Sequence, residues 1–299
     1  MRSGLIFVTL AFFILTAPCS SRASSEGGGH AVRQKRFIRD LFSQKRYFDV
    51  ISETRRLMAL DPAGDERKDY SFFIDVNYFL GRQYRTVVMN ITSRPGPLDC
   101  RSGILLSQSY LRLGMNGRSL EAALRVRYDA VEGPGRYPLL ARRAEAYLGC
   151  NMYRELLEEI RAAGQYIPDG ARVGLLRDEV ERFRLVPLKS VPLAVALSVL
   201  FPGAGQMYAG KWVHGIVSFI GVASLAGGAC LLHRQGNRDL SYVFMAFTSV
   251  FYLGTIYGAY NAAQTANEDL HRSFGNGIRE KCIPPYEPAE EVRDNRVFR

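Results

Sequence analysis

The chain is poor in the residues from which metal and catalytic sites are built. Its 299 residues include five cysteines and four histidines. The four cysteines that follow Cys19 lie too far apart in sequence for the paired spacing of a zinc site, and the chain has no His-Glu-x-x-His box. It also has no nucleophile elbow and no phosphate-binding glycine loop. We therefore expect a protein that is not an enzyme and that has no metal and no cofactor.

The chain also has few blocks of like charge, although its net charge is +10. Basic and acidic residues alternate along the first half, and the densest basic cluster is Arg33-Gln-Lys-Arg36. Alternating charges of this kind are typical of a solvated helix surface. The alternative is a weak attraction to anionic lipid headgroups. Neither reading favours nucleic acid as a partner.

What the chain does have is three long stretches without charged residues near its C-terminus. The first is Ser190–Phe201, the second is Trp212–Leu232 with His214 as its one basic group, and the third is Leu240–Tyr260. A helix of about 20 apolar residues crosses a bilayer core. The sequence therefore predicts membrane spans at 212–232 and 240–260. The first stretch is too short to span and predicts a half-inserted helix.

The N-terminus has the pattern of a secretory signal peptide. Arg2 precedes an apolar run at 5–17, and small polar residues follow. Cleavage after Ala23 is the preferred interpretation, which makes 1–23 the signal. Lipidation at Cys19 and an uncut signal are the alternatives. The pattern predicts that the residues after it are exported.

Residues 31–170 contain an internal repeat. Tyr47, Tyr84, Ser119 and Tyr153 follow one another at intervals of 37, 35 and 34 residues, and a proline lies 15 residues after three of them. This period resembles the tetratricopeptide repeat, a pair of antiparallel helices whose second helix begins at an aromatic residue. The expected second helices are 47–60, 84–93, 118–132 and 152–164, followed by a capping helix and linker at 171–187. Stacking of the four pairs would bury one continuous core.

This resemblance implies a function in binding proteins or peptides along a concave face lined by the first helices. Alignment to the family places both basic and apolar residues there. The candidate peptide-binding residues are Lys35, Arg39, Phe72, Val76, Phe79 and Leu111. An apolar groove fits them better than a clamp for an acidic C-terminus. The same groove could equally be closed by the chain's own tail, which contains Ile283-Pro-Pro-Tyr-Glu-Pro288.

The segment between the half-helix and the first span carries the motif Pro-Gly-x-Gly-Gln-x-Tyr-x-Gly. This motif resembles that of the small bacterial two-transmembrane-domain family, which implies an architecture and no settled activity. Its glycines predict a sharp turn, and its glutamine is expected to satisfy backbone groups freed at that turn. The motif residues with an expected structural role are Pro202, Gly203, Gly205, Gln206, Tyr208 and Gly210.

Small residues in the two spans predict that the helices pack closely. They include Gly221, Gly227 and Gly228 in the first span and Gly254 and Gly258 in the second. Because glycine has no side chain, two membrane helices can approach each other closely at such positions.

The turn between the spans indicates the topology. Residues 233–239 include Arg234 and Arg238 against Asp239. The positive-inside rule places this turn in the cytoplasm, so the repeats and the C-terminus would lie outside it. An exported repeat region requires the same orientation.

Together these patterns predict an all-α protein with a tetratricopeptide-like α-solenoid, a membrane domain at 188–270 and a polar tail at 271–299. The expected function is a periplasm-facing scaffold, anchored in a bacterial inner membrane, that binds proteins or peptides in an envelope assembly. The alternative is a membrane-active or transport-related hairpin regulated by the repeats. Membrane lipid is an expected partner of either, and homo-oligomerisation is left open.

Overall fold

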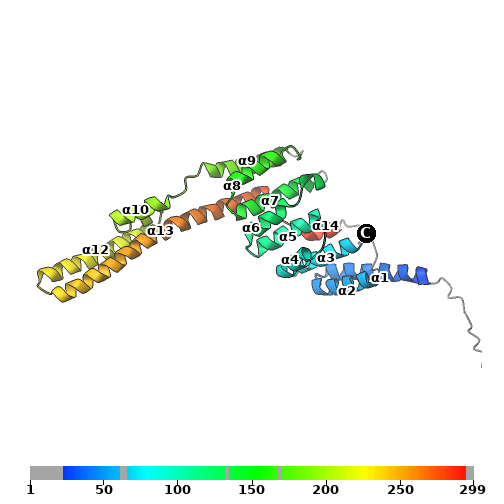
Figure 1. Ribbon diagram of the computed structural model, residues 1–299, viewed down its shortest axis with the longest axis horizontal. Coiled ribbons are helices and arrows are strands. Elements are labelled where there is room, and N and C mark those ends of the chain that lie inside the picture. The colour runs from blue at the N-terminus through cyan, green and yellow to red at the C-terminus, as the bar shows by residue number, and fades with distance from the viewer. Residues whose placement is uncertain (1–22, 61–65, 132–134, 168–169, 294–299) are drawn as a thin grey trace, which may run out of the picture. The chain divides into compact units, whose positions relative to one another are not determined.

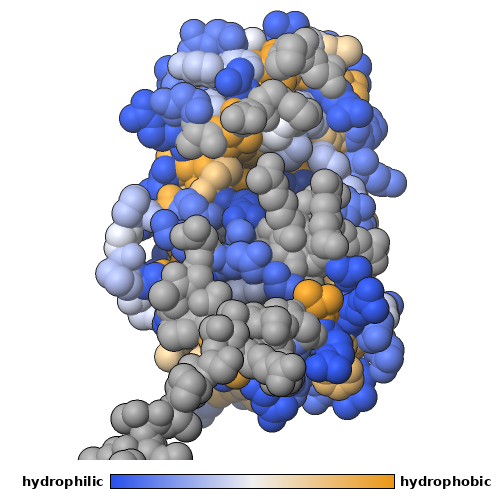
Figure 2. All heavy atoms as spheres, turned by 90° about the vertical axis from the view of Figure 1, so that its right-hand side faces the viewer, coloured by the Kyte–Doolittle hydropathy of each residue, from blue (hydrophilic) through white to orange (hydrophobic). Residues whose placement is uncertain are grey.

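The computed structural model describes residues 23–60, 66–131, 135–167 and 170–293. Within those ranges the regular structure is helical, without a strand, which confirms the all-α prediction. The proposed signal peptide lies almost entirely outside the described residues. The chain divides into two compact units, one formed by 1–82 with 289–299 and the other by 83–288. Among the coloured residues in Figure 2 most are hydrophilic, with smaller hydrophobic areas between them.

The first unit contains α1 (Ala23–Ser43), α2 (Tyr47–Leu60) and α3 (Arg67–Leu80), and most of α14 (Pro288–Arg293). Helix α2 packs against both α1 and α3. The buried residues of α1 and α2 recur mostly every three or four positions, the spacing at which side chains share one helix face, whereas α3 is buried along most of its length. The buried residues of the three helices include Ile38, Leu41, Val50, Leu57, Phe73 and Val76.

The second unit continues the helix pairs with α4 (Tyr84–Thr92), α5 (Cys100–Arg112), α6 (Asn116–Leu124), α7 (Arg136–Gly149), α8 (Tyr153–Ala163) and α9 (Gly170–Arg184). Each of these helices packs against the next, and α5 also packs against α7. Contact between alternate helices is the arrangement of stacked helix pairs.

The turn inside each helix pair has a common backbone geometry. The residue two positions before the second helix has a positive φ in all four pairs, at Lys45 (59°), Arg82 (60°), Gly114 (73°) and Asn151 (58°). The second helices begin where the repeat pattern predicts in three pairs. The third is an exception, because α6 runs over 116–124 rather than 118–132 and a 3-10 turn at 128–130 follows it.

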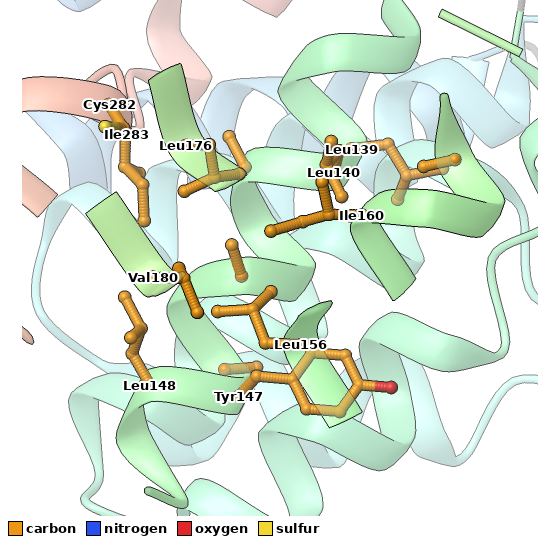
Figure 3. Packing of buried hydrophobic residues seen from close by; sticks show 14 of the residues in the cluster. Leu139, Leu140, Tyr147, Leu148, Leu156, Ile160, Leu176, Val180, Cys282 and Ile283 are labelled. Carbon is orange, nitrogen blue, oxygen red and sulfur yellow. The ribbon is translucent and has the colours of Figure 1, made fainter. Parts of the chain in front are cut away.

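The core of the second unit lies between α7, α8 and α9 (Figure 3). Leu139, Leu140, Leu156 and Leu176 are fully buried there. Cys282 and Ile283, which follow the predicted membrane spans, belong to the same hydrophobic cluster. This part of the predicted polar tail is therefore core, which corrects the boundary at residue 271.

Two helices are long and apolar enough to cross a membrane, α12 (Trp212–Arg234) and α13 (Arg238–Cys282). Only 17% and 11% of their most apolar windows are buried, so they differ from core helices of a soluble domain. Helix α13 has 45 residues, which corresponds to about 67 Å. A bilayer core is about 30 Å thick, so the helix continues well beyond the predicted end of the span at Tyr260. Figure 1 shows it running from the hairpin with α12 to the repeat helices, where it packs against α7 and α9.

The expected packing of small residues in the hairpin is only partly correct. An added Cβ at Gly221, Gly227 or Gly254 would meet no atom within 4 Å. Gly228 does lie against the ring of Phe244, 3.1 Å from such a Cβ, and Gly258 lies against Gln206. The first three glycines therefore face away from the helix contact.

Candidate functional site

Three of the predicted peptide-binding residues are buried rather than open to a ligand. Phe72, Val76 and Phe79 are 2%, 0% and 6% exposed, so they contribute to the core of the first unit. Lys35 forms an ion pair with Glu66 at 2.8 Å. Arg39 is exposed. The helical spacing of Phe72, Val76 and Phe79 predicts a binding face, whereas in the structure these residues lie on a buried face.

Glu66 in this unit accepts hydrogen bonds from Lys35 and from the hydroxyl of Tyr70. These bonds hold the pKa of its carboxyl below the usual range. The positive charge of Lys35 is thereby balanced within the unit, so this side chain is less suited to bind the carboxylate of a ligand.

Leu111, the remaining candidate, lies in the second unit beside a cavity of about 660 Å³. The cavity is bounded by the ends of α5 and α7 on one side and by α13 on the other. Its charged lining residues are Arg112, Glu145, Glu268, Arg272 and Arg279. Because charges of both signs line it, the cavity has no clear preference for an anion or a cation.

The chain's own tail occupies the face of α7. The hydroxyl of Tyr137 donates to the backbone carbonyl of Cys282 at 2.6 Å, and Arg142 donates to the carbonyl of Pro284. The guanidinium of Arg142 also lies over the ring of Tyr286, 5.7 Å from its centroid. The tail, which the sequence predicts as one possible occupant of the repeat groove, therefore contacts α7.

Arg142 is held in place from behind by a polar network. One of its nitrogens donates to Glu145 at 2.9 Å, and Gln108 on α5 donates to the same carboxylate oxygen at 2.9 Å. The side chains of Arg142 and Glu145 are only 5% and 16% exposed. A buried ion pair with these extra hydrogen bonds fixes the direction of the guanidinium group.

Sequence reasoning missed Arg142. A signal was present, because Arg142 and Arg143 interrupt an otherwise apolar helix between Leu140 and Ala144. Two adjacent charges in a buried helix need partners from neighbouring elements, and both have them.

The last turns of α13 are fixed on α8 and α9 by aromatic and polar contacts. Tyr153 stacks on Phe183 with ring centroids 4.0 Å apart and on His271 at 5.4 Å, and its hydroxyl donates to the His271 carbonyl at 3.2 Å. Lys281 forms an ion pair with Glu179 at 3.1 Å. Burial lowers the pKa of His271 and raises the pKa of the Cys282 thiol. Both groups therefore favour their neutral forms at neutral pH.

The membrane motif forms a compact turn between α10 (Val191–Leu200), α11 (Ala204–Tyr208) and α12. Gly203 has φ +86°, and a Cβ there would lie 2.1 Å from the carbonyl oxygen of Gly215. A Cβ on Gly205 would lie 1.9 Å from the carbonyl oxygen of Ala194. Both distances are far below van der Waals contact. Only glycine fits at these two positions.

The polar residues of the motif act differently from the expectation. The side chain of Gln206 accepts a hydrogen bond from Ser218 at 3.0 Å, whereas Ser198 accepts the backbone N–H of Gly205 at 3.0 Å. Ser198, which the sequence did not single out, therefore satisfies the turn. Tyr208 accepts the N–H of Ser190 at 3.1 Å. Pro202 precedes the turn and Gly210 follows α11 with φ +88°.

Asn267 on α13 closes the base of the motif. Its side chain accepts the N–H of Lys189 at 2.8 Å and donates to the Lys189 carbonyl at 2.9 Å. The Lys189 ammonium lies 5.1 Å from the centroid of the Tyr208 ring. These contacts join the start of α10 to the part of α13 that follows the span.

The comparisons with known proteins give no assignment. No family model matches the chain, and neither a curated protein nor a solved structure is similar to it.

Proposed function

We propose that the protein is a membrane-anchored scaffold whose helical repeats bind extended segments of other proteins. On this proposal the repeats are tetratricopeptide-like, the signal peptide exports them, and a hairpin of the small two-transmembrane-domain type holds them at the inner membrane. The partners belong to an assembly in the bacterial envelope.

The observation that carries the proposal is the tail on α7. An extended segment is held there by Arg142, which donates to the Pro284 carbonyl, and Tyr137 donates to the carbonyl of Cys282 at the end of α13 just before the segment. Recognition of main-chain groups by fixed side chains is how a repeat surface binds a peptide. The helix pairs and the two apolar helices are in accord with the same proposal.

The competing function is transport through the hairpin. The segments 212–232 and 240–260 contain no acidic residue and no lysine or arginine. Ionisable groups within the membrane are the usual mark of an ion or proton path. His214, the third residue of α12, is the one such group in these segments, and the lack of acidic residues, lysine and arginine favours the anchor. Flux of ions or solutes through vesicles containing the purified protein would reverse this preference.

Site-specific photo-crosslinking in cells tests the scaffold. A photoreactive residue at Arg112, at the rim of the cavity, is expected to form adducts with other polypeptides. The same photoreactive residue at Val217, a position on α12 that is 64% exposed, is the control and is expected to label lipid only. Repeat positions that give no polypeptide adducts in the full-length protein would contradict the proposal.

The topology gives a separate prediction. In a cysteine-free background, a cysteine at Gln235 is expected to react only with reagents that reach the cytoplasm. A cysteine at Ser273 is expected to react from the outer side. Both positions are exposed, whereas the native Cys282 is buried and is a poor reporter. The reverse labelling would overturn the orientation and the export of the repeats.

A further inference from the structure

The segment between α13 and α14 is held on α7 in the manner of a bound peptide. Residues 283–287 have no regular secondary structure. Ile283 is buried and Tyr286 is half-buried, while Pro284, Pro285 and Glu287 are exposed. Burial at an interval of three residues is the pattern of a polyproline II helix, which has three residues per turn and which prolines favour.

The surface beneath this segment is built to receive backbone carbonyls. Arg142 donates to the Pro284 carbonyl of the segment, and Tyr137 donates to the carbonyl of Cys282, the last residue of α13. Backbone carbonyls of this kind are present in every peptide. Selectivity comes from the cluster that surrounds Ile283 and from the contact of Tyr286 with the Arg142 guanidinium. The ligand class is therefore an extended segment with an apolar residue, two prolines and an aromatic residue in that order.

Arg142 contacts both the rest of the second unit and the segment. It donates to Glu145 on its own helix and to the Pro284 carbonyl of the segment. Removal of the segment without a replacement would take this acceptor away from a side chain that is only 5% exposed, which is unfavourable. Another peptide carbonyl would restore the bond.

We infer that this face of α7 is the acceptor site for an extended apolar–Pro–Pro–aromatic segment of a partner protein, and that residues 283–286 are its internal competitor. The inference rests on the proposed peptide-binding function and adds the site and the chemistry of the ligand. A tethered competitor acts at an effective concentration on the order of millimolar. The free protein is thus largely closed to the partner, and binding requires release of the tail.

Fluorescence anisotropy with the full-length protein in mild detergent tests this inference. The probe is a labelled peptide with the sequence of residues 280–288, in which serine replaces Cys282. Wild type is expected to bind it weakly. Tyr286→Ser in the protein weakens the internal competitor and leaves the acceptor residues intact, so the probe is expected to bind at least about tenfold more tightly.

A second variant guards against misfolding. Pro284→Gly combined with Pro285→Gly changes two exposed residues and makes the tail more flexible. It is expected to strengthen probe binding in the same direction. Arg142→Gln added to either variant is expected to abolish the gain, whereas Arg154→Gln, at an 86% exposed side chain, is expected to leave it unchanged. A probe with serine in place of its tyrosine is expected to bind poorly.

The inference is overturned if the folded tail variants bind the probe no better than wild type, or if Arg142→Gln has no effect on the gain. If either result is found while a photoreactive residue at Arg112 still crosslinks partner proteins, the proposed scaffold function remains supported and only this binding site is ruled out. Probe binding without any crosslinked partner would support the site and count against the scaffold in the envelope.

Discussion

Gly205→Ala is expected to remove most of the correctly folded membrane domain. The new Cβ would lie 1.9 Å from the Ala194 carbonyl oxygen and 2.7 Å from the Ala259 Cβ, so α10 and α13 must move apart. Overfilling a packed interior costs about 1–3 kcal/mol, and a clash with backbone on this scale belongs at the upper end. The readout is the yield of protein extracted in mild detergent and its thermal unfolding followed by the fluorescence of Trp212, the single tryptophan.

Gly254→Ala is the matched control. Gly254 also lies within a long apolar helix, but an added Cβ there meets no atom within 4 Å. Alanine favours a helix by about 1 kcal/mol over glycine, so this variant is expected to be as stable as wild type or slightly more so. Gly236 is less suitable as a control because its φ of +83° strains any other residue. Similar yields for Gly205→Ala and Gly254→Ala would mean that the turn at 202–211 is loose.

Arg143→Met is expected to be the most damaging substitution within the repeats. Arg143 is 6% exposed, pairs with Glu159, and donates to the carbonyls of Ala123 and Val126. The variant removes the guanidinium from two carbonyls and from the Glu159 carboxylate, which is 14% exposed and then has the uncharged hydroxyl of Tyr128 as its donor. Breaking a buried ion pair in this way costs about 3–5 kcal/mol. Thermal unfolding followed by circular dichroism at 222 nm measures the loss.

Arg154→Met is the control for this prediction. Its side chain is 86% exposed and lies 3.8 Å from Glu158. Exposed pairs contribute roughly 0–1 kcal/mol, so little change is expected. Adding Glu159→Gln to Arg143→Met is expected to recover part of the lost stability, because an uncharged amide then replaces the carboxylate. No recovery would indicate that the two carbonyl contacts, rather than the ion pair, carry the effect.

The helices of this protein could be predicted from sequence because their signals are local. Tyr47, Tyr84 and Tyr153 each begin a helix, as the repeat pattern predicts. In the third repeat the spacing points to Ser119 and so predicts a second helix that begins at residue 118. Gly114 has the positive φ of the turn, and α6 begins two residues later, at Asn116. The start of each second helix follows the turn rather than the aromatic residue.

The binding face could not be predicted in the same way. An apolar stripe such as Phe72, Val76 and Phe79 has the same spacing whether it faces a core or a groove. The contact between Arg142 and Pro284 joins residues 142 positions apart, and no local pattern reports it. The continuation of α13 beyond residue 270 is not apparent in the sequence because residues 271–282 are polar enough to resemble a tail, although Ile278 is 1% exposed and belongs to the core of the repeats.

The placement of Ile278, Cys282 and Ile283 in the repeat core has a consequence for biogenesis. These residues are synthesised after both apolar helices, yet they complete a hydrophobic cluster formed by helices made much earlier. Until they arrive, the cluster around α7 and α9 presents apolar side chains to water. A hairpin that crosses the bilayer twice returns them to the compartment of the repeats, whereas a chain that crosses once delivers them to the opposite side. Only a correctly inserted chain can therefore finish its own fold, and a misinserted one is left with the exposed surface that quality-control proteases recognise.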